Sequence, residues 1–402
     1  LGLTVFTLAS AGAALAPSVE WLVAARAAQG VGGAMVLPLT LTMLSAAVPP
    51  ARRGAALGAW GAVNGVAVAL GPLVGGAVVQ GLAWQWIFWV NVPIGIVLVP
   101  VVLRRLPHSL GVPRSLDLPG VALATAGLLG VVYGLVRGNA LGWTSTTVLA
   151  SVAAGVVLLV AFVTWERRAS EPVLPLAMFG SRSFSAANGV SVLFSFGMFG
   201  SIFLLAQYLQ TVQGSTPLEA GLKTLPWTAM PLLVAPVAGP LSDRIGGRPL
   251  LVTGLALQAL GLGWLAATMT TSTPYTEMVP AFALSGIGMG MVFAPLANVV
   301  LGGVDRSLEG IASGTNNALR EIGGVFGVAA LASVFSGQGG YESRQTFVDG
   351  TVPALWVGAV AVGTGALAGL LIPRRGRHAA VAAVADRGAE AEPVPLAVPA
   401  PA

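Results

Sequence analysis

Three charged residues lie inside long apolar stretches of this chain, namely Arg26, Arg320 and Glu321. Arg26 is about six residues into its stretch, which on a helix corresponds to roughly 9 Å. A charge at that depth in a membrane is costly and marks a functional site by default, although a long Arg side chain can also extend back to the interface. A buried carboxyl such as Glu321 can bind and release protons, because burial disfavours its charged form. Glu321 therefore indicates either proton exchange or a static ion pair with Arg320, although adjacent residues on a helix point about 100° apart.

A short polar turn, GPLSDRIGGRP, holds a second group of charges around two glycines: Asp243, Arg244 and Arg248. An Asp close to a helix N-terminus can accept hydrogen bonds from its unpaired backbone N–H groups. An Arg nearby can form a charge pair that breaks when the surrounding helices move. The turn is interpreted either in this way or as an ordinary basic loop.

Small residues recur at a spacing of four along the stretch WGAVNGVAVALGPLVGGAVV. Gly61 with Gly65, and Gly71 with Gly75, would each lie on one face of a helix, where the backbone of a partner helix can approach closely. Pro72 removes a backbone donor and bends the helix. The stretch predicts a tightly packed membrane helix.

The elements that carry these residues are long apolar segments. The chain has 402 residues, of which 55% are hydrophobic and only 9% are charged, whereas soluble proteins carry about 25% charged residues. A helix needs about 20 apolar residues to cross the hydrocarbon core, and the segments lack the alternating polarity of a membrane barrel. The sequence therefore predicts an all-α polytopic membrane protein. We count twelve segments: Leu1–Ala16, Trp21–Val48, Ala55–Gly81, Ile87–Leu103, Pro119–Val136, Thr144–Trp165, Ser185–Tyr208, Leu218–Leu241, Leu250–Met269, Met278–Val304, Gly310–Phe335 and Val352–Ile372.

Lys and Arg are unevenly distributed between the loops that join these segments. One set of alternate loops, with the C-terminal tail, holds fifteen of them, and the other set holds only Arg137, Lys223 and Arg344. Because cytoplasmic loops are enriched in Lys and Arg, we expect a cytoplasmic C-terminus in a multi-pass protein of the plasma (inner) membrane. Topology then explains the net charge of +5, and no nucleic-acid partner is expected. Tryptophans near segment ends are expected to act as interfacial anchors: Trp84, Trp86, Trp143 and Trp165.

Several kinds of chemistry are disfavoured by residues that are absent or badly placed. The chain has no cysteine, and His108 and His378 lie in charged segments, so a metal site or an intramembrane catalytic cluster is not expected. A phosphate-binding loop would need the sequence G-K-[ST], but the single lysine, Lys223, follows Leu222. An enzyme and an ATP-driven exporter are therefore disfavoured. Movement of a solute across the bilayer is favoured, with a non-transporting membrane scaffold as a remote alternative.

Five stretches of the sequence resemble the major facilitator superfamily. The pattern G-P-x-x-G-G from Gly71 to Gly76 resembles the antiporter motif on the family's fifth helix. The stretch AARAAQGVGGAM is similar to the family's fourth-helix motif, with an embedded Arg followed by Gln-Gly, here Arg26, Gln29 and Gly30. Three further stretches resemble parts of the fourteen-helix drug:proton antiporters. The start of the sixth helix is matched by WQWIFWVNVPIG, and the penultimate helix by SGTNNALREIGGVFGVA. The second copy of the family's cytoplasmic loop motif is matched by GPLSDRIGGRP.

The resemblance covers nearly the whole chain and implies a major facilitator fold, with two pseudo-symmetric helix bundles and two extra central helices. The motif helix is the family's fifth but the third here, which implies that the first two helices are missing and that twelve of fourteen are visible; an unusual start codon on a complete protein is the alternative. The expected domains are residues 1–105, the four remaining helices of the N-terminal bundle; 106–184, the central pair and a cytoplasmic linker; 185–373, the six-helix C-terminal bundle; and 374–402, a disordered cytoplasmic tail rich in Ala and Pro.

The resemblance also implies a function, namely proton-coupled secondary transport that exports drugs or other amphipathic small molecules. No cofactor is implied beyond the proton gradient, and a monomer in the lipid bilayer is expected. Arg26 is assigned by resemblance to proton transfer, and the turn at Asp243, Arg244 and Arg248 to gating. The sequence leaves open an alternative, a dedicated exporter of an endogenous metabolite or a self-made antibiotic.

The substrate pocket of such a transporter is expected between the bundles, near the middle of the membrane. Aromatic and amide side chains suit a large apolar or cationic solute. For two of the candidates, Gln29 and Asn64, helix packing is the competing interpretation. The candidates are Gln29, Asn64, Asn188, Phe194, Phe196, Phe199, Gln207, Trp227, Gln258 and Asn298.

Overall fold

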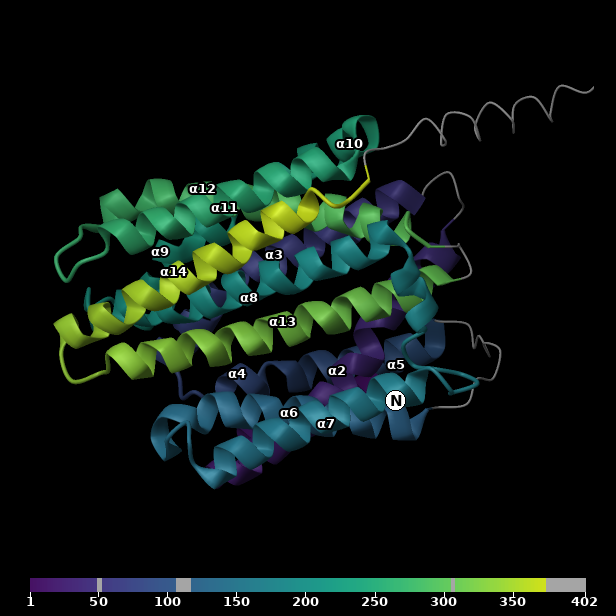
Figure 1. Ribbon diagram of the computed structural model, residues 1–402, viewed down its shortest axis with the longest axis horizontal. Helices are drawn as coiled ribbons and strands as arrows, with labels where there is room; N and C mark the ends of the chain where they lie inside the picture. The colour runs from purple at the N-terminus through teal and green to yellow at the C-terminus, as the bar shows by residue number, and fades with distance from the viewer. Residues whose placement is uncertain (49–52, 106–116, 305–307, 374–402) are drawn as a thin grey trace, which may run out of the picture.

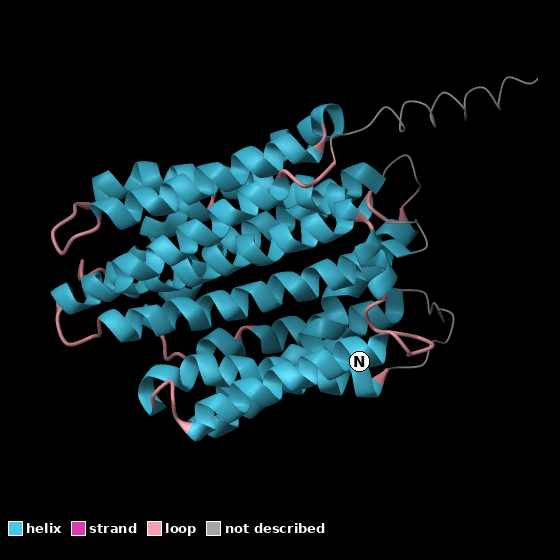
Figure 2. Cartoon of the chain, in the orientation of Figure 1, coloured by secondary structure: helices cyan, strands magenta, loops and turns pink. Residues whose placement is uncertain are grey.

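The computed structural model describes residues 1–48, 53–105, 117–304 and 308–373, and these residues form helices joined by short loops (Figure 2). In chain order the helices are α1 (Gly2–Ala14), α2 (Val19–Ala47), α3 (Arg53–Gly81), α4 (Trp86–Trp89), α5 (Asn91–Arg105), α6 (Leu118–Leu141), α7 (Thr146–Glu166), the 3-10 helix η2 (Leu176–Gly180), α8 (Arg182–Thr211), α9 (Pro217–Thr228), α10 (Met230–Ile245), α11 (Gly247–Thr268), α12 (Tyr275–Leu301), α13 (Glu309–Gln338) and α14 (Arg344–Gly369).

Each of the twelve predicted apolar segments coincides with a helix or with two consecutive helices. Within the described residues, nine spans are long and apolar enough to cross a membrane, with α4 and α5 forming one of them and α9 and α10 another. Two shorter apolar helices are Gly2–Ala14 and the end of α3, Leu70–Gly81. The all-α polytopic membrane fold is confirmed, and the number of twelve membrane spans stays a prediction.

Polar caps and prolines explain where several helices begin and break. The side chains of Ser18, Ser145 and Ser181 accept backbone hydrogen bonds at the starts of α2, α7 and α8, which satisfies N–H groups that have no partner within the helix. Between α9 and α10, Pro226 and Pro231 lack the N–H groups that a continuous helix would use. The predicted segment Leu218–Leu241 is therefore two helices in line.

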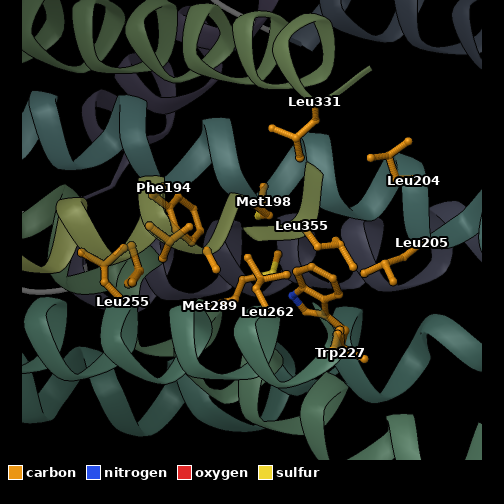
Figure 3. Close-up of a cluster of buried hydrophobic side chains, with 14 of the residues drawn as sticks. Phe194, Met198, Leu204, Leu205, Trp227, Leu255, Leu262, Met289, Leu331 and Leu355 are labelled. Atoms are coloured by element: carbon orange, nitrogen blue, oxygen red, sulfur yellow. The ribbon is translucent and has the colours of Figure 1, made fainter. Parts of the chain in front are cut away.

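The hydrophobic core lies in the C-terminal half, between α8, α9, α11, α12, α13 and α14 (Figure 1). Figure 3 shows Phe194, Met289 and Trp227 among the side chains that converge there from different helices. Glycines let the backbones approach closely, as at Gly254, where a Cβ would lie 2.7 Å from the carbonyl oxygen of Gly288. The large apolar residues of the N-terminal helices are mostly exposed, as expected for side chains that face lipid.

The hairpin of α6 and α7 lies beside α13 along one side of the molecule (Figure 1). The amide of Asn139 on α6 donates to the carbonyl oxygen of Ser333 on α13, and Trp143 Nε1 donates to Asn139 Oδ1 over 2.7 Å. This pair of helices therefore contacts the C-terminal helices directly. The proposed domain boundaries stay a prediction, and residues 374–402 lie outside the described residues.

The two ends of the helix bundle differ in charge. We call one of them the Arg-rich end, because α5 ends there at Arg105, α7 is followed by Arg167 and Arg168, and α8 begins at Arg182. It lies on the right in Figure 1. The opposite end carries the loops 142–145, 212–216, 269–274 and 339–343.

Candidate functional site

The embedded arginine of the N-terminal helices belongs to a chain of hydrogen bonds between α2 and α1. Arg26 Nη1 donates to Gln29 Oε1 over 2.5 Å, and Gln29 Nε2 donates to Ser10 Oγ over 2.6 Å. Ser10 Oγ in turn donates to the carbonyl oxygen of Phe6, 2.7 Å away. Gln29 is only 3% exposed. We call Arg26, Gln29 and Ser10 the α1–α2 relay.

Arg26 lacks an acidic partner among the described residues. Its guanidinium carbon lies 5.7 Å from the centre of the Phe88 ring, a cation–π distance. The positive charge of Arg26 is therefore stabilised by the amide oxygen of Gln29 and the face of the Phe88 ring, and not by a carboxylate. Arg26 is thus exposed on the surface of α2, one turn from the buried amide of Gln29.

The second charged group of the sequence is an ion pair on α13. Arg320 Nη2 lies 3.3 Å from Glu321 Oε1, and the same nitrogen donates to Asn317 Oδ1 over 2.8 Å. The side chain of Glu321 is 57% exposed, compared with 32% for Arg320. The ion pair weighed from the sequence therefore forms although the two residues are adjacent, because both side chains are long and flexible.

The glycine-rich helix α3 meets α9 through backbone contacts near the opposite end. A Cβ on Gly76 would overlap the carbonyl oxygen of Pro217, and a Cβ on Gly221 would lie 2.5 Å from the carbonyl oxygen of Pro72. The amide N–H of Leu218 also donates to Gln80 Oε1 over 3.2 Å. We call this contact between α3 and α9 the α3–α9 seam. It joins the N-terminal half to the C-terminal half where both helices approach the opposite end.

The seam does not use the glycines that the spacing of four suggested. A Cβ on Gly71 or Gly75 would find no atom within 4 Å. The expectation that this pair packs against a helix backbone is therefore corrected, because Gly76 faces α9 in their place. The surroundings of Gly61, Asn64 and Gly65, within α3, lie outside the described residues.

The stretch of residues 239–249 comprises the end of α10, the single joining residue Gly246 and the start of α11. Gly246 adopts φ 88°, a left-handed conformation that suits glycine, and its N–H donates to the carbonyl oxygen of Ser242 over 2.9 Å. Arg244 is exposed and Arg248 is half-buried. The surroundings of the Asp243 side chain lie outside the described residues, so the proposed charge pair in this turn stays a prediction.

The candidate pocket residues do not gather in one place. Trp227 and Gln258 are buried within the C-terminal core, as are Phe194 and Asn188. Asn188 Oδ1 accepts from Asn316 Nδ2 over 3.0 Å, which ties α8 to α13. These four side chains therefore pack helices together, and they do not line a surface that a solute can reach in this arrangement.

The remaining candidates lie closer to the surface. Phe199 is exposed and Phe196 is half-buried, and both pack against glycines of α13. Gln207 Oε1 accepts a hydrogen bond from Tyr341 Oη over 2.6 Å at the opposite end, and Asn298 is exposed on α12. Two surface hollows, of about 280 and 450 Å³, involve none of these residues.

Sequence reasoning missed three participants, namely Ser10, Gly221 and Asn317. Ser10 is a lone hydroxyl in an apolar helix, and Gly221 is one small residue among 54 glycines in the chain. Asn317 stands within SGTNNALREIGG, one turn before Glu321. The last of these could have been found, because residues three or four apart on a helix are neighbours.

Comparison with known proteins identifies the family. The sequence model of the Major Facilitator Superfamily matches residues 1–328 and, in a second match, residues 187–398. The chain belongs to the major facilitator superfamily. Its relatives are membrane transporters rather than enzymes, in agreement with the resemblance seen in the five motifs.

Three relatives illustrate the range of this branch of the major facilitator superfamily. The uncharacterized MFS-type transporter Rv1250 of Mycobacterium tuberculosis is 36% identical over 83% of the chain and 58% of its own length. The tetracenomycin C resistance and export protein of Streptomyces glaucescens is 32% identical over 88% of the chain and 66% of its own length. The multidrug resistance protein Stp of Mycobacterium tuberculosis is 34% identical over 84% and 63%. The chain thus spans less than two thirds of each of these relatives.

The fold of this major facilitator chain is also similar to solved structures. The POT family transporter PepTSo aligns over 92% of the chain and 82% of its own length, with a TM-score of 0.63. The sequence identity of 15% makes this a likeness of fold alone. The arrangement of helices described above is therefore that of a major facilitator transporter.

Proposed function

We propose that this chain is the major part of a proton-coupled transporter that exports drugs or other amphipathic small molecules. The observation that carries the proposal is the α3–α9 seam, in which the antiporter motif of α3 is in backbone contact with α9. A transporter that exchanges a solute for protons must prevent both from leaking through an open pathway. A seam of two backbones with glycines on both sides excludes water over the length of the contact, and it can separate as a unit when the halves move.

The orientation in the membrane follows from the charges. The Arg-rich end faces the cytoplasm in this proposal, together with the C-terminus, because positively charged loops are retained there. The seam then closes the side that faces outward. Solute enters from the cytoplasm or the inner leaflet, and protons enter from outside.

Two polar groups supply the proton coupling in this proposal. Arg26 holds a positive charge beside the buried amide of Gln29, and its match to the family's fourth-helix motif assigns it to proton transfer. Glu321 is paired with Arg320. Protonation of Glu321 removes its attraction for Arg320, which retains Asn317 as its partner, so α13 carries one charge more in the protonated state.

A second candidate function is export of one endogenous metabolite or self-made antibiotic. The relative that favours it is the tetracenomycin C resistance and export protein, whose name joins resistance to export of one compound. Stp, a multidrug resistance protein, favours the broader activity. The residues that line the substrate pocket decide between these two functions.

The experiment that tests the proposal uses inverted membrane vesicles from cells that express the chain. Respiration acidifies the vesicle interior, and uptake of an amphipathic cationic dye is followed by fluorescence. We expect uptake that depends on the proton gradient and stops when a protonophore is added. Uptake that survives the protonophore and requires ATP would contradict proton coupling. No uptake by this chain, but uptake by the longer relative Stp under the same conditions, would show that activity requires residues outside the chain.

A further inference from the structure

Two acidic side chains meet at the Arg-rich end of the α6–α7 hairpin. Asp117 immediately precedes α6, and Glu166 is the last residue of α7. Because the two helices run antiparallel and side by side (Figure 1), the start of one lies against the end of the other. Asp117 is 9% exposed and Glu166 is 3% exposed. Neither residue belongs to the motifs or to the proton-coupling groups described above.

Each carboxyl group has one oxygen that is held by backbone or ring N–H donors. Asp117 Oδ1 accepts from the backbone N–H of Gly120 over 2.9 Å and from Trp165 Nε1 over 2.7 Å. Glu166 Oε2 accepts from the backbone N–H of Leu174 over 3.0 Å. Asp117 therefore caps α6, and Glu166 ties the end of α7 to the linker that leads into α8. Trp165, expected from the sequence to anchor the chain at the interface, is part of this cluster.

The other oxygen of each carboxyl group is buried and has no hydrogen-bond partner. These atoms are Asp117 Oδ2 and Glu166 Oε1. Both lie closer than 3.0 Å to the position that a Cβ on Gly120 would take, so they lie side by side over that glycine. Two buried, ionised oxygens in such a position would repel each other and would each lack a donor. A single hydrogen between them removes both costs.

The charged groups around the pair do not replace that hydrogen. Arg167 and Arg168 follow Glu166 directly but are exposed, and neither contacts the two carboxyl groups. On α13, which packs against α6, Arg320 and Glu321 pair with each other. Glu171 and Glu309 are exposed, and Arg114 lies outside the described residues.

The hydrogen bond from Gly120 identifies which group is the anion. This bond lowers the pKa of Asp117, the group that stands outside the helix and caps it. Asp117 therefore stays ionised, and Glu166 is the partner that carries a proton. An O–H on Glu166 Oε1 can donate to Asp117 Oδ2 while Oε2 keeps its bond to Leu174.

We propose that Asp117 and Glu166 form a proton-binding site, a carboxylic acid–carboxylate pair whose one shared proton fastens the Arg-rich end of the α6–α7 hairpin. The site couples the proton concentration at that end to the linker of residues 167–181. With the proton bound, α6, α7 and Leu174 are joined. When it is lost, two adjacent carboxylates drive the ends apart, and the linker is released from Glu166.

The test uses the whole chain purified in lipid nanodiscs, with Glu166→Gln as the central variant. A glutamine places an N–H where the shared proton stood and keeps an oxygen for Leu174, so it mimics the protonated pair at every pH. Infrared spectra near neutral pH should show a carboxylic acid C=O band that Glu166→Gln removes. Asp117→Asn, which supplies an N–H from the other side, should remove the same band, because Glu166 can then be ionised. Asp349→Asn, an exposed acid at the opposite end, should keep it.

Local opening is measured in parallel by amide hydrogen exchange of residues 117–121 and 166–176. The closed pair holds one proton, which Glu166 releases when local opening exposes it to water. The opening constant, obtained by dividing the exchange rate by the intrinsic rate, should therefore increase with pH by up to about tenfold per unit. In Glu166→Gln the opening constant should not depend on pH. A band that persists in Glu166→Gln, or equal pH dependence in wild type and in this variant, would overturn the proposal. Because no step measures transport, failure of the transport proposal would leave this result unaffected.

Discussion

The carbonyl oxygen of Pro72 lies 2.5 Å from the position that a Cβ on Gly221 would occupy. Pro72 belongs to the stretch of α3 that resembles the antiporter motif, whereas Gly221 stands on α9 in the C-terminal half. Gly221 has no Cβ, so the two helices are in backbone contact at this level. One turn along α3, Gly76 repeats the arrangement against Pro217. The stretch around Pro72 thus contacts a glycine that lies about 150 positions further along the chain.

Replacing Gly221 by Leu should abolish gradient-driven dye uptake. The new side chain would have to displace the α3 backbone, and such overpacking costs about 1–3 kcal/mol. Gly76→Leu should act in the same way from the other side of the seam. Uptake is measured in inverted vesicles, after immunoblotting has shown equal membrane insertion.

The matched controls are Gly71→Leu and Gly75→Leu, on the same helix. Both positions have open space around the added Cβ, so uptake should stay close to wild type if this arrangement is the one that transports. Loss of uptake in these controls but not in Gly221→Leu would mean that the spacing argument from the sequence, rather than the observed seam, describes the working contact.

The α1–α2 relay predicts a stability effect at Gln29. Gln29→Leu keeps the volume of the side chain but leaves Ser10 Oγ without its donor and Arg26 without its amide partner. A buried polar group that loses its partner costs about 1–3 kcal/mol, so thermal unfolding should shift to lower temperature. Gln210→Leu serves as the control, because Gln210 is exposed and bonds only within its own helix. Equal unfolding temperatures in both variants would show that the relay contributes nothing to stability.

The absence of cysteine from the chain allows a clean test of orientation. Ser170→Cys places a thiol in the exposed loop at the Arg-rich end, and Ser272→Cys places one in the exposed loop at the opposite end. A membrane-impermeant maleimide added to intact cells should label the cysteine at position 272 alone, and permeabilised cells should show labelling at both. The reverse pattern would place the C-terminus outside the cell.

The apolar runs predicted the helices well because a membrane span depends on length and hydropathy, which the sequence states directly. Boundaries were less predictable. α14 begins at Arg344, well before the predicted Val352, because the polar first turns resemble a loop and are held by the cap of Ser343. Breaks at Val90 and Ala229 within single apolar runs were also not expected.

The site was harder to predict than the fold, since it depends on how helices are rotated against one another. Gly71, Gly75 and Gly76 all fit a small-residue face, and only the position of α9 shows that Gly76 makes the contact. In the same way, the partner of Gln29 depends on the register of α1 against α2. Trp227 was expected to line a pocket, but the packing of α9 against α12 places it beside Phe282, with ring centres 6.1 Å apart.

The ion pair on α13 leads to the last prediction, a change in the pH dependence of transport. Glu321→Gln removes the only titratable member of the pair while keeping its shape and leaves Arg320 bonded to Asn317. If Glu321 exchanges protons during the cycle, the variant should keep dye binding but lose the dependence of uptake rate on external pH. The measurement is initial uptake in vesicles whose interior, the side topologically outside the cell, is buffered between pH 5 and 8. Glu342→Gln, an exposed acid in the loop at the opposite end, should leave the profile unchanged. If Glu321→Gln keeps the wild-type profile, Glu321 takes no part in proton coupling. Arg320 and Glu321 then form only a surface ion pair, and such pairs contribute about 0–1 kcal/mol to stability.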